Sequence, residues 1–305
     1  MSFAMTSAPA KFVFGKPENP RRTVWFLLGP CIAYLIVFSI YPLFHSLRLS
    51  FTDLTAAGGT GNWIGLKNYA DLLVDPLFWN AARNSAIMVT LAVALQVVLG
   101  VALAMFFNLH LRGSWIVRGI LLLPMLIPPI VVGVMWRALL NPDWGLVDWI
   151  ISRFGLTPPD WLGSVDMAIV TLVLVDSWQW TPFVFIIVFA RLQALPQDVF
   201  EAANVDGAGS WVTFRRITLP MLMPAIVFAS VFRAVDAFRS FDLIYGLSYG
   251  GPARGTTTLS FFAFQNGFQF QNYGYAAAVA YSMLIILAGG TTVILRYVHI
   301  RGPGQ

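Results

Sequence analysis

Six long apolar runs restrict the folds open to this chain. They cover about residues 24–47, 85–108, 116–139, 167–190, 219–245 and 275–298. Each run approaches or exceeds the roughly 20 residues that a helix needs to cross a ~30 Å hydrocarbon core. Strands of a membrane barrel would be about ten residues long and would alternate polar and apolar side chains. The runs are longer and continuous, so the sequence predicts an all-α integral membrane protein with six transmembrane helices.

Composition agrees with a membrane location. Charged residues make up 11% of the chain, against roughly 25% in a soluble domain. This excludes an ordinary cytosolic enzyme, a disordered regulator and a secreted disulfide scaffold. The net charge of +5 does not indicate nucleic-acid binding, because the basic residues are scattered and form no stripe. The single cysteine, Cys31, lies in an apolar run and is interpreted as a small core residue.

Basic residues are distributed unevenly between the two sides of the predicted spans. One side carries eleven Lys and Arg residues and the other carries six, while Arg233 and Arg239 lie inside the fifth run. Because cytoplasmic loops are enriched in Lys and Arg, both termini are predicted to be cytoplasmic. The loops 48–84, 140–166 and 246–274 are then outside. The first run is longer than a signal-peptide core and no Ala-x-Ala site follows it, which predicts an uncleaved span.

This reading divides the chain into three parts. They are a cytoplasmic N-terminal segment (1–23), a six-helix domain (24–298) and a cytoplasmic tail (299–305). Within the domain, the predicted cytoplasmic segment 191–218 is unusually polar, with six charged residues. Pro196 presets a helix start, Gly207 supplies a residue able to take a positive φ, and Ser210 is placed to cap a second helix. The segment is therefore predicted to form a short helix–turn–helix that ends at Leu219-Pro220.

The same segment resembles the EAA loop of binding-protein-dependent ABC importer permeases. The family pattern is Glu-Ala-Ala, two residues, Asp-Gly-Ala, and then Phe, Ile, Leu-Pro and a further Pro. Every one of these positions is filled here, by Glu201, Ala202, Ala203, Asp206, Gly207, Ala208, Phe214, Ile217, Leu219, Pro220 and Pro224. In that family the loop forms the coupling helix, which sits in a cleft of the ATPase subunit. The resemblance implies the type I importer fold and this coupling role.

A second resemblance narrows the substrate class. Residues Phe241-Asp242-Leu243-Ile244-Tyr245, followed by Gly250-Gly251-Pro252, are similar to a segment of carbohydrate-type permeases, with Ser248 where Thr is usual. The resemblance implies import of a di- or oligosaccharide, or of a related polyol or glycerol-phosphate compound. It also implies four partners in a bacterial cytoplasmic membrane: two ATP-binding subunits, a second homologous permease (as a heterodimer) and an extracytoplasmic sugar-binding protein.

Catalytic chemistry is not indicated on this chain. The one Gly-Lys pair, Gly15-Lys16, is followed by Pro17, so there is no phosphate-binding loop. ATP and Mg²⁺ are therefore expected on the ATPase partners and no cofactor is expected here. The three histidines, His45, His110 and His299, are far apart in sequence and predict no metal site. No nucleophile–base pairing for an enzyme is evident.

Charged residues inside spans are costly and usually face a partner or a cavity. Asp176 lies in the fourth run, and Arg233, Asp236, Arg239 and Asp242 recur every three residues in the fifth. Two interpretations stay open: a structural ion ladder along one helix face, or a polar wall of the translocation path. Asp236 is favoured for the ladder and Asp242 for the path. The substrate-path candidates are Asp176, Trp178, Gln179, Asp236, Phe238, Asp242 and Tyr245.

An alternative function is a stand-alone secondary transporter driven by ions through Asp176 and Asp236. That alternative predicts an inverted repeat and needs no coupling loop, and no repeat is evident in the sequence.

Overall fold

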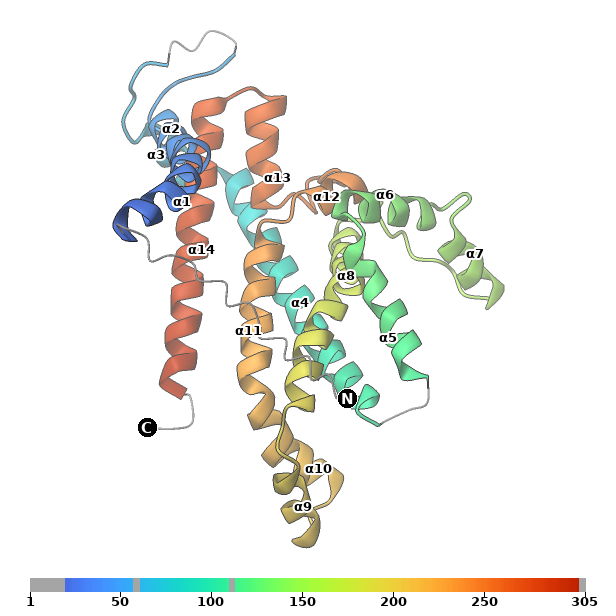
Figure 1. The fold of residues 1–305 in the computed structure, drawn as a ribbon. Coiled ribbons are helices and arrows are strands. Elements are labelled where there is room, and N and C mark those ends of the chain that lie inside the picture. Colours follow the sequence, from blue (N-terminus) through green and yellow to red (C-terminus); the bar gives the residue numbers. More distant parts are fainter. Residues whose placement is uncertain (1–19, 57–60, 110–112, 302–305) are drawn as a thin grey trace, which may run out of the picture. The chain divides into compact units, whose positions relative to one another are not determined.

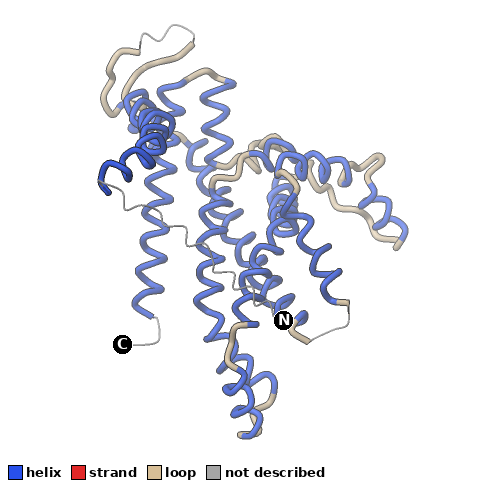
Figure 2. Tube along the Cα trace, viewed as in Figure 1, coloured by secondary structure: helices blue, strands red, loops and turns tan. Residues whose placement is uncertain are grey.

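The computed structural model describes residues 20–56, 61–109 and 113–301. Figure 2 shows these residues as helices joined by loops, with no strand among them; two isolated β-bridges pair Thr52 with Trp63 and Thr55 with Asn272. The chain divides into two compact units, residues 1–48 and 49–305. Most of the predicted N-terminal segment and the end of the predicted tail lie outside the described residues.

The first unit is a single apolar helical stretch. It consists of α1 (Pro20–Leu35), a π-helical turn η1 (Ile36–Ile40) and α2 (Tyr41–Leu49), whose last residue belongs to the second unit. Residues Leu28–Leu49 are long and apolar enough to cross a membrane, in agreement with the predicted first span. Its large side chains are exposed, as lipid-facing side chains should be. Cys31 is also exposed, so its interpretation as a core residue is wrong.

The second unit is built on three packed helices, as Figure 1 shows: α4 (Pro76–Phe107), α8 (Val165–Gln193) and α11 (Leu219–Phe238). An apolar cluster that includes Ala104, Phe185, Val188, Leu222 and Ala229 joins them. The close approach depends on small residues. A Cβ on Gly100 of α4 would lie 2.7 Å from Val184 of α8. With no hydrophobic force between helices in lipid, such small-residue contacts are what lets them associate.

The remaining elements of the second unit follow in chain order. Their bounds are α3 (Lys67–Val74), α5 (Ser114–Leu122), η2 (Leu123–Leu126), α6 (Pro129–Leu139), α7 (Leu146–Arg153), α9 (Gln197–Val205), α10 (Ser210–Thr213), η3 (Phe214–Thr218), α12 (Asp242–Leu247), α13 (Leu259–Phe264), η4 (Gln265–Gln269) and α14 (Tyr273–Arg301). Within this unit, α9 and α10 lie at one end of the three packed helices, and α6 and α12 lie towards the other (Figure 1).

Five helical stretches of the described chain are long and apolar enough to span a membrane, and the third predicted run makes a sixth if its two halves form one span. That run is bent by 99° between Ser114–Leu126 and Pro129–Leu139. The bend falls at Pro128 and Pro129, where prolines remove backbone donors and restrict the preceding residue. The second span begins earlier than predicted, because Asp75 caps α4 by accepting a hydrogen bond from Leu77 N at 2.8 Å.

The fifth predicted span, 219–245, is wrong at its far end. The helix α11 stops at Phe238, residues 239–241 are non-helical, and α12 starts at Asp242. Arg239, Ser240 and Asp242 interrupt the apolar sequence here, but no proline or glycine marks the break. The i+3 face that the sequence predicted through Arg239 and Asp242 therefore does not exist, since those two residues are not on the helix that holds Arg233 and Asp236.

The two short helices that follow the breaks, α6 and α12, cross backbone to backbone. A Cβ on Gly133 would lie 2.8 Å from Leu243 O, and a Cβ on Gly246 would lie 2.7 Å from Ile130 O. Such distances leave no room for any side chain. The apolar cluster beside them contains Val132, Leu243 and Leu247. The two helices are thus held as one element whose first residues, Pro129 and Asp242, line a cavity.

Candidate functional site

The 191–218 segment contains a helix with a well-defined end. Helix α9 begins after Pro196 and stops at Val205. Gly207 takes φ +73°, its N–H donates to Asn204 O at 3.1 Å, and Ala208 N donates to Ala203 O at 2.9 Å. This is the Schellman arrangement, in which a left-handed residue closes a helix and satisfies its last carbonyls. The predicted first helix and its glycine stop are confirmed.

The second half of the segment differs from the prediction. Ser210 is the first helical residue and not the cap, because the N-cap is Gly209. The helix does not end at Leu219-Pro220 either. Residues Ser210–Phe238 form one span candidate that passes through the π-helical turn η3 into α11. Pro220 falls where the π-helical turn η3 passes into α11, and the helical stretch continues through it.

One face of α9 is open and the other is packed. Glu201, Ala202 and Asp206 are exposed, and Val205 is 88% exposed. Ala203 is buried and Phe200 packs against the main apolar cluster. The open face of α9 therefore carries the carboxylates of Glu201 and Asp206 close to the exposed Val205 side chain.

A buried polar cluster joins the three packed helices. Arg233 of α11 donates from Nε to Gln96 Oε1 at 3.0 Å, from Nη2 to Asp176 Oδ2 at 3.0 Å, and from Nη1 to Asp236. Gln96 Nε2 of α4 also donates to Asp176 Oδ2 at 2.8 Å. Trp180 of α8 covers the guanidinium, with 4.5 Å from Cζ to the ring centroid. Arg233, Asp176 and Gln96 are almost completely buried.

The arrangement satisfies what a buried charge requires. An ion taken out of water needs an opposite charge and further hydrogen bonds to offset its desolvation. Here one guanidinium binds two carboxylates and an amide, and stacks on an aromatic ring. The predicted ion pairing is thus present for Arg233 and Asp236, with Asp176 as the additional, more buried partner. Neither Arg239 nor Asp242 forms an ion pair within the described part of the chain.

A cavity of about 200 Å³ lies beside this cluster. Asp176, Gln179 and Trp180 reach it from α8, Asp236 from α11 and Asp242 from the start of α12. The side chain of Asp236 is 35% exposed. Gln179 donates to Ile127 O at 2.9 Å, which anchors the bend before α6. Its Oε1 is buried with no hydrogen-bond partner among the described residues, and a buried acceptor of this kind calls for a ligand or water.

Three predicted path residues lie elsewhere. Trp178 is 37% exposed and packs edge-on against Trp136, with 5.4 Å between ring centroids. Phe238 packs in an apolar cluster with Leu72 and Phe78. Tyr245 packs against the rings of Phe241, at a tilt, and Phe264, edge-on. The structure therefore brings together Asp176, Gln179, Asp236 and Asp242 of the candidate set, and leaves these three aromatics outside the cavity lining.

The substrate-path candidates drawn from the sequence lacked Gln96 of the cluster and several residues that line the cavity, among them Trp180, Ser240 and Phe241. Gln96 carried a usable signal, because it is the one polar side chain in the apolar stretch 91–105, and polar groups inside spans are usually functional. Trp180 is two residues from Trp178, which places it on a different face of α8. The packing of α8 decides which of these two tryptophan side chains contacts the cluster.

Known proteins resemble this chain over nearly its whole length. The family model described as binding-protein-dependent transport system inner membrane component matches residues 96–300. A probable ABC transporter permease of Sinorhizobium fredii, y4oQ, is 37% identical, over 90% of this chain and 89% of its own. The trehalose/maltose transport system permease protein MalF of Thermococcus litoralis is 33% identical, over 91% and 94%. The sulfoquinovosyl glycerol transport system permease protein SmoG of Agrobacterium fabrum is 32% identical, over 93% and 96%.

The fold also matches a solved structure. A chain of a bacterial ABC transporter involved in the import of the acidic polysaccharide alginate superposes with a TM-score of 0.77 at 23% identity, over 90% of this chain and 96% of that one. This likeness confirms the predicted helical ABC importer permease fold. With the family match over two thirds of its residues and relatives above 30% identity across almost all of it, the chain belongs to the family of binding-protein-dependent transport system inner membrane components.

Proposed function

We propose that this chain is the permease subunit of an ATP-driven importer that moves a sugar across the bacterial cytoplasmic membrane. One observation carries the proposal: the single helical stretch Ser210–Phe238 runs from the 191–218 segment to the wall of the polar cavity at Asp236. Because a helix is stiff along its axis, a displacement of α9 and α10 is transmitted along this stretch to the cavity wall. The chain itself then performs translocation and not hydrolysis.

The partners follow from this role. Two ATP-binding subunits hold ATP and Mg²⁺ and press on the exposed face of α9 around Glu201, Ala202 and Asp206. A second, homologous permease chain completes the path, and an extracytoplasmic sugar-binding protein delivers the substrate. Both termini and the 191–218 segment are cytoplasmic, in keeping with the charge asymmetry. Nucleic acid is not among the proposed partners. One solved relative of similar fold was crystallised with its alginate pentasaccharide-bound periplasmic protein, which supports the delivery step.

The cavity lining supports a sugar as substrate. Asp236, Asp242 and the unpartnered Gln179 Oε1 offer acceptors to hydroxyl groups, while Trp180 and Phe241 offer apolar ring faces. At about 200 Å³ the cavity is smaller than the ~300–1,000 Å³ of typical small-molecule sites. It therefore holds part of a di- or oligosaccharide at a time, and the homologous subunit supplies the rest of the contact surface. Several relatives carry names of sugar transport systems, namely trehalose, maltose and lactose.

The experiment is uptake into vesicles that contain the complete complex and its binding protein. Labelled trehalose, maltose and lactose are offered with ATP on the membrane side that bears the 191–218 segment or on the opposite side. Each condition is repeated with ion gradients intact and with gradients collapsed by an ionophore. The proposal expects uptake of at least one sugar that needs ATP on the 191–218 side and survives loss of the gradients. Uptake by this chain alone that disappears with the gradients would instead establish the stand-alone secondary transporter, which family membership does not favour.

A further inference from the structure

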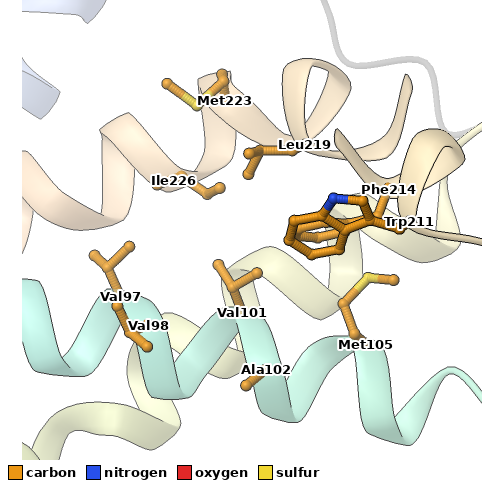
Figure 3. Close-up of a pocket in the computed structure, with 10 residues that line it drawn as sticks. All are labelled: Val97, Val98, Val101, Ala102, Met105, Trp211, Phe214, Leu219, Met223 and Ile226. Atoms are coloured by element: carbon orange, nitrogen blue, oxygen red, sulfur yellow. The ribbon is translucent and has the colours of Figure 1, made fainter. Parts of the chain in front are cut away.

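An apolar groove lies between α4 and α11, on the side of the bundle that the 191–218 segment adjoins. Its volume is about 620 Å³. Figure 3 shows Val97, Val101 and Met105 of α4 on one wall, facing Leu219, Met223 and Ile226 of α11, with Trp211 and Phe214 closing one end. The lining side chains are apolar throughout, apart from the indole N–H of Trp211.

The groove has the length of one membrane leaflet. From Trp211 to Ile226 the helix advances about 20 Å at ~1.5 Å per residue. Half of a bilayer that is ~40–45 Å thick with its headgroups is about the same length. Ile226 is two turns from Arg233, the buried charge in the middle of the bundle. Trp211 is 70% exposed at the opposite end, where amphipathic aromatic rings sit at headgroup depth.

Positive charge adjoins the headgroup end of the groove. Arg215 and Arg216 follow Phe214 directly and precede Leu219 by one helical turn. Both are exposed, and neither forms an ion pair with any described residue. Two free guanidinium groups beside an apolar slot match the two parts of an anionic phospholipid, because a guanidinium binds phosphate oxygens well and the slot accepts an acyl chain.

We infer that this groove is a binding site for an anionic phospholipid of the leaflet next to the 191–218 segment. One acyl chain lies between α4 and α11, and the phosphate rests on Arg215 and Arg216 with Trp211 beside the glycerol region. The lipid thereby packs against the end of α11 that adjoins the 191–218 segment. This proposal is independent of the sugar that the chain transports.

The test uses quenching of tryptophan fluorescence by brominated acyl chains. The assembled complex is placed in lipid nanodiscs that contain brominated phosphatidylglycerol or brominated phosphatidylcholine at matched fractions. The signal of Trp211 is obtained by subtracting the spectrum of Trp211→Phe, which removes the indole and keeps an aromatic ring. Quenching of this component is expected to be stronger with the anionic lipid. Each arginine should raise the relative affinity for the anionic over the zwitterionic lipid on the order of fivefold.

Three further variants separate the parts of the site. Arg215→Gln with Arg216→Gln should bring the preference for the anionic lipid close to one, while Arg296→Gln, which removes an exposed charge on α14, should leave it unchanged. Ala102→Phe fills the groove from its exposed α4 wall and should reduce quenching by both lipids. Three results would overturn the proposal: no quenching of Trp211, which means that protein covers the groove; equal quenching by both lipids; or a preference that persists without the two arginines.

Discussion

Arg233 Nη2 of α11 lies 3.0 Å from Asp176 Oδ2 of α8, and both side chains are buried. The same guanidinium binds Gln96 of α4. One side chain therefore ties together the three helices on which the bundle is built. Asp236, its third partner, is half-buried, is the least buried member of the set and lines the cavity. Of the ion ladder that the sequence suggested, only the pairing of Arg233 with Asp236 is present, and Asp236 also lines the cavity.

The buried pair should behave as a unit in stability measurements. Arg233→Gln leaves Asp176 buried without its charge partner and should cost about 3–5 kcal/mol, whereas neutralising both residues should cost much less than the sum of the single changes. The measurement is the yield and thermal unfolding of the assembled complex for Arg233→Gln, Asp176→Asn and the double variant. Arg239→Gln, an exposed arginine at the cavity, is the matched control. Additive losses in the double variant would contradict the coupling.

Removal of the cavity carboxylate should affect transport more than folding. Asp236→Asn keeps the shape and an acceptor oxygen, and Arg233 retains Asp176. If Asp236 accepts a hydrogen bond from substrate, loss of the charge costs about 1.5–3 kcal/mol, or roughly 10–100-fold in uptake efficiency. Uptake kinetics are measured beside the yield of the complex, with the exposed Asp166→Asn of α8 as control. Normal uptake by Asp236→Asn would remove this residue from the path.

The turn after α9 should control coupling. Gly207→Val forces a β-branched residue to φ +73°, a conformation that costs about 1–3 kcal/mol outside glycine. The α9 surface is then presented at a changed angle to α10 and α11. We expect normal insertion and assembly, with ATP hydrolysis no longer producing uptake. Gly209→Ser is the control, because Gly209 has ordinary backbone angles and occupies an N-cap where serine is favoured. Equal uptake per ATP in both variants would exclude a coupling role for this turn.

The point where α6 and α12 cross should not accommodate a side chain at Gly246. Gly246→Ala places a Cβ 2.7 Å from the backbone oxygen of Ile130, which only a shift of a whole helix relieves. A loss of stability of at least about 1–3 kcal/mol is expected from such overpacking. Gly119→Ala in α5 is the control, since a Cβ there meets nothing within 4 Å, and its effect should stay within about 1 kcal/mol. Thermal unfolding of the two complexes gives the comparison, and equal melting temperatures would show that α6 and α12 separate easily.

Local features of the chain were readable from the sequence. Helices satisfy their backbone groups internally, so long apolar runs predict spans without reference to neighbours. The bend at Pro128 and Pro129 and the stop at Gly207 were predictable in the same way, because proline and glycine act on their own backbone. The contiguous motif from Glu201 to Pro224 indicated the family, and the family is confirmed.

Contacts between distant segments were decided only by the tertiary structure. Gln96, Asp176 and Arg233 are separated by 80 and 57 residues along the chain, and no periodicity within one helix indicates that their side chains meet. The end of α11 at Phe238 was hidden for the same reason. The polar residues Arg239, Ser240 and Asp242 lie at the break, but no proline or glycine marks it, and α12 is held against α6 by the close backbone contacts at Gly246 and Gly133. Sequence periodicity describes which face of a helix is apolar; which neighbour covers that face, and where a cavity is left between neighbours, depends on packing in three dimensions.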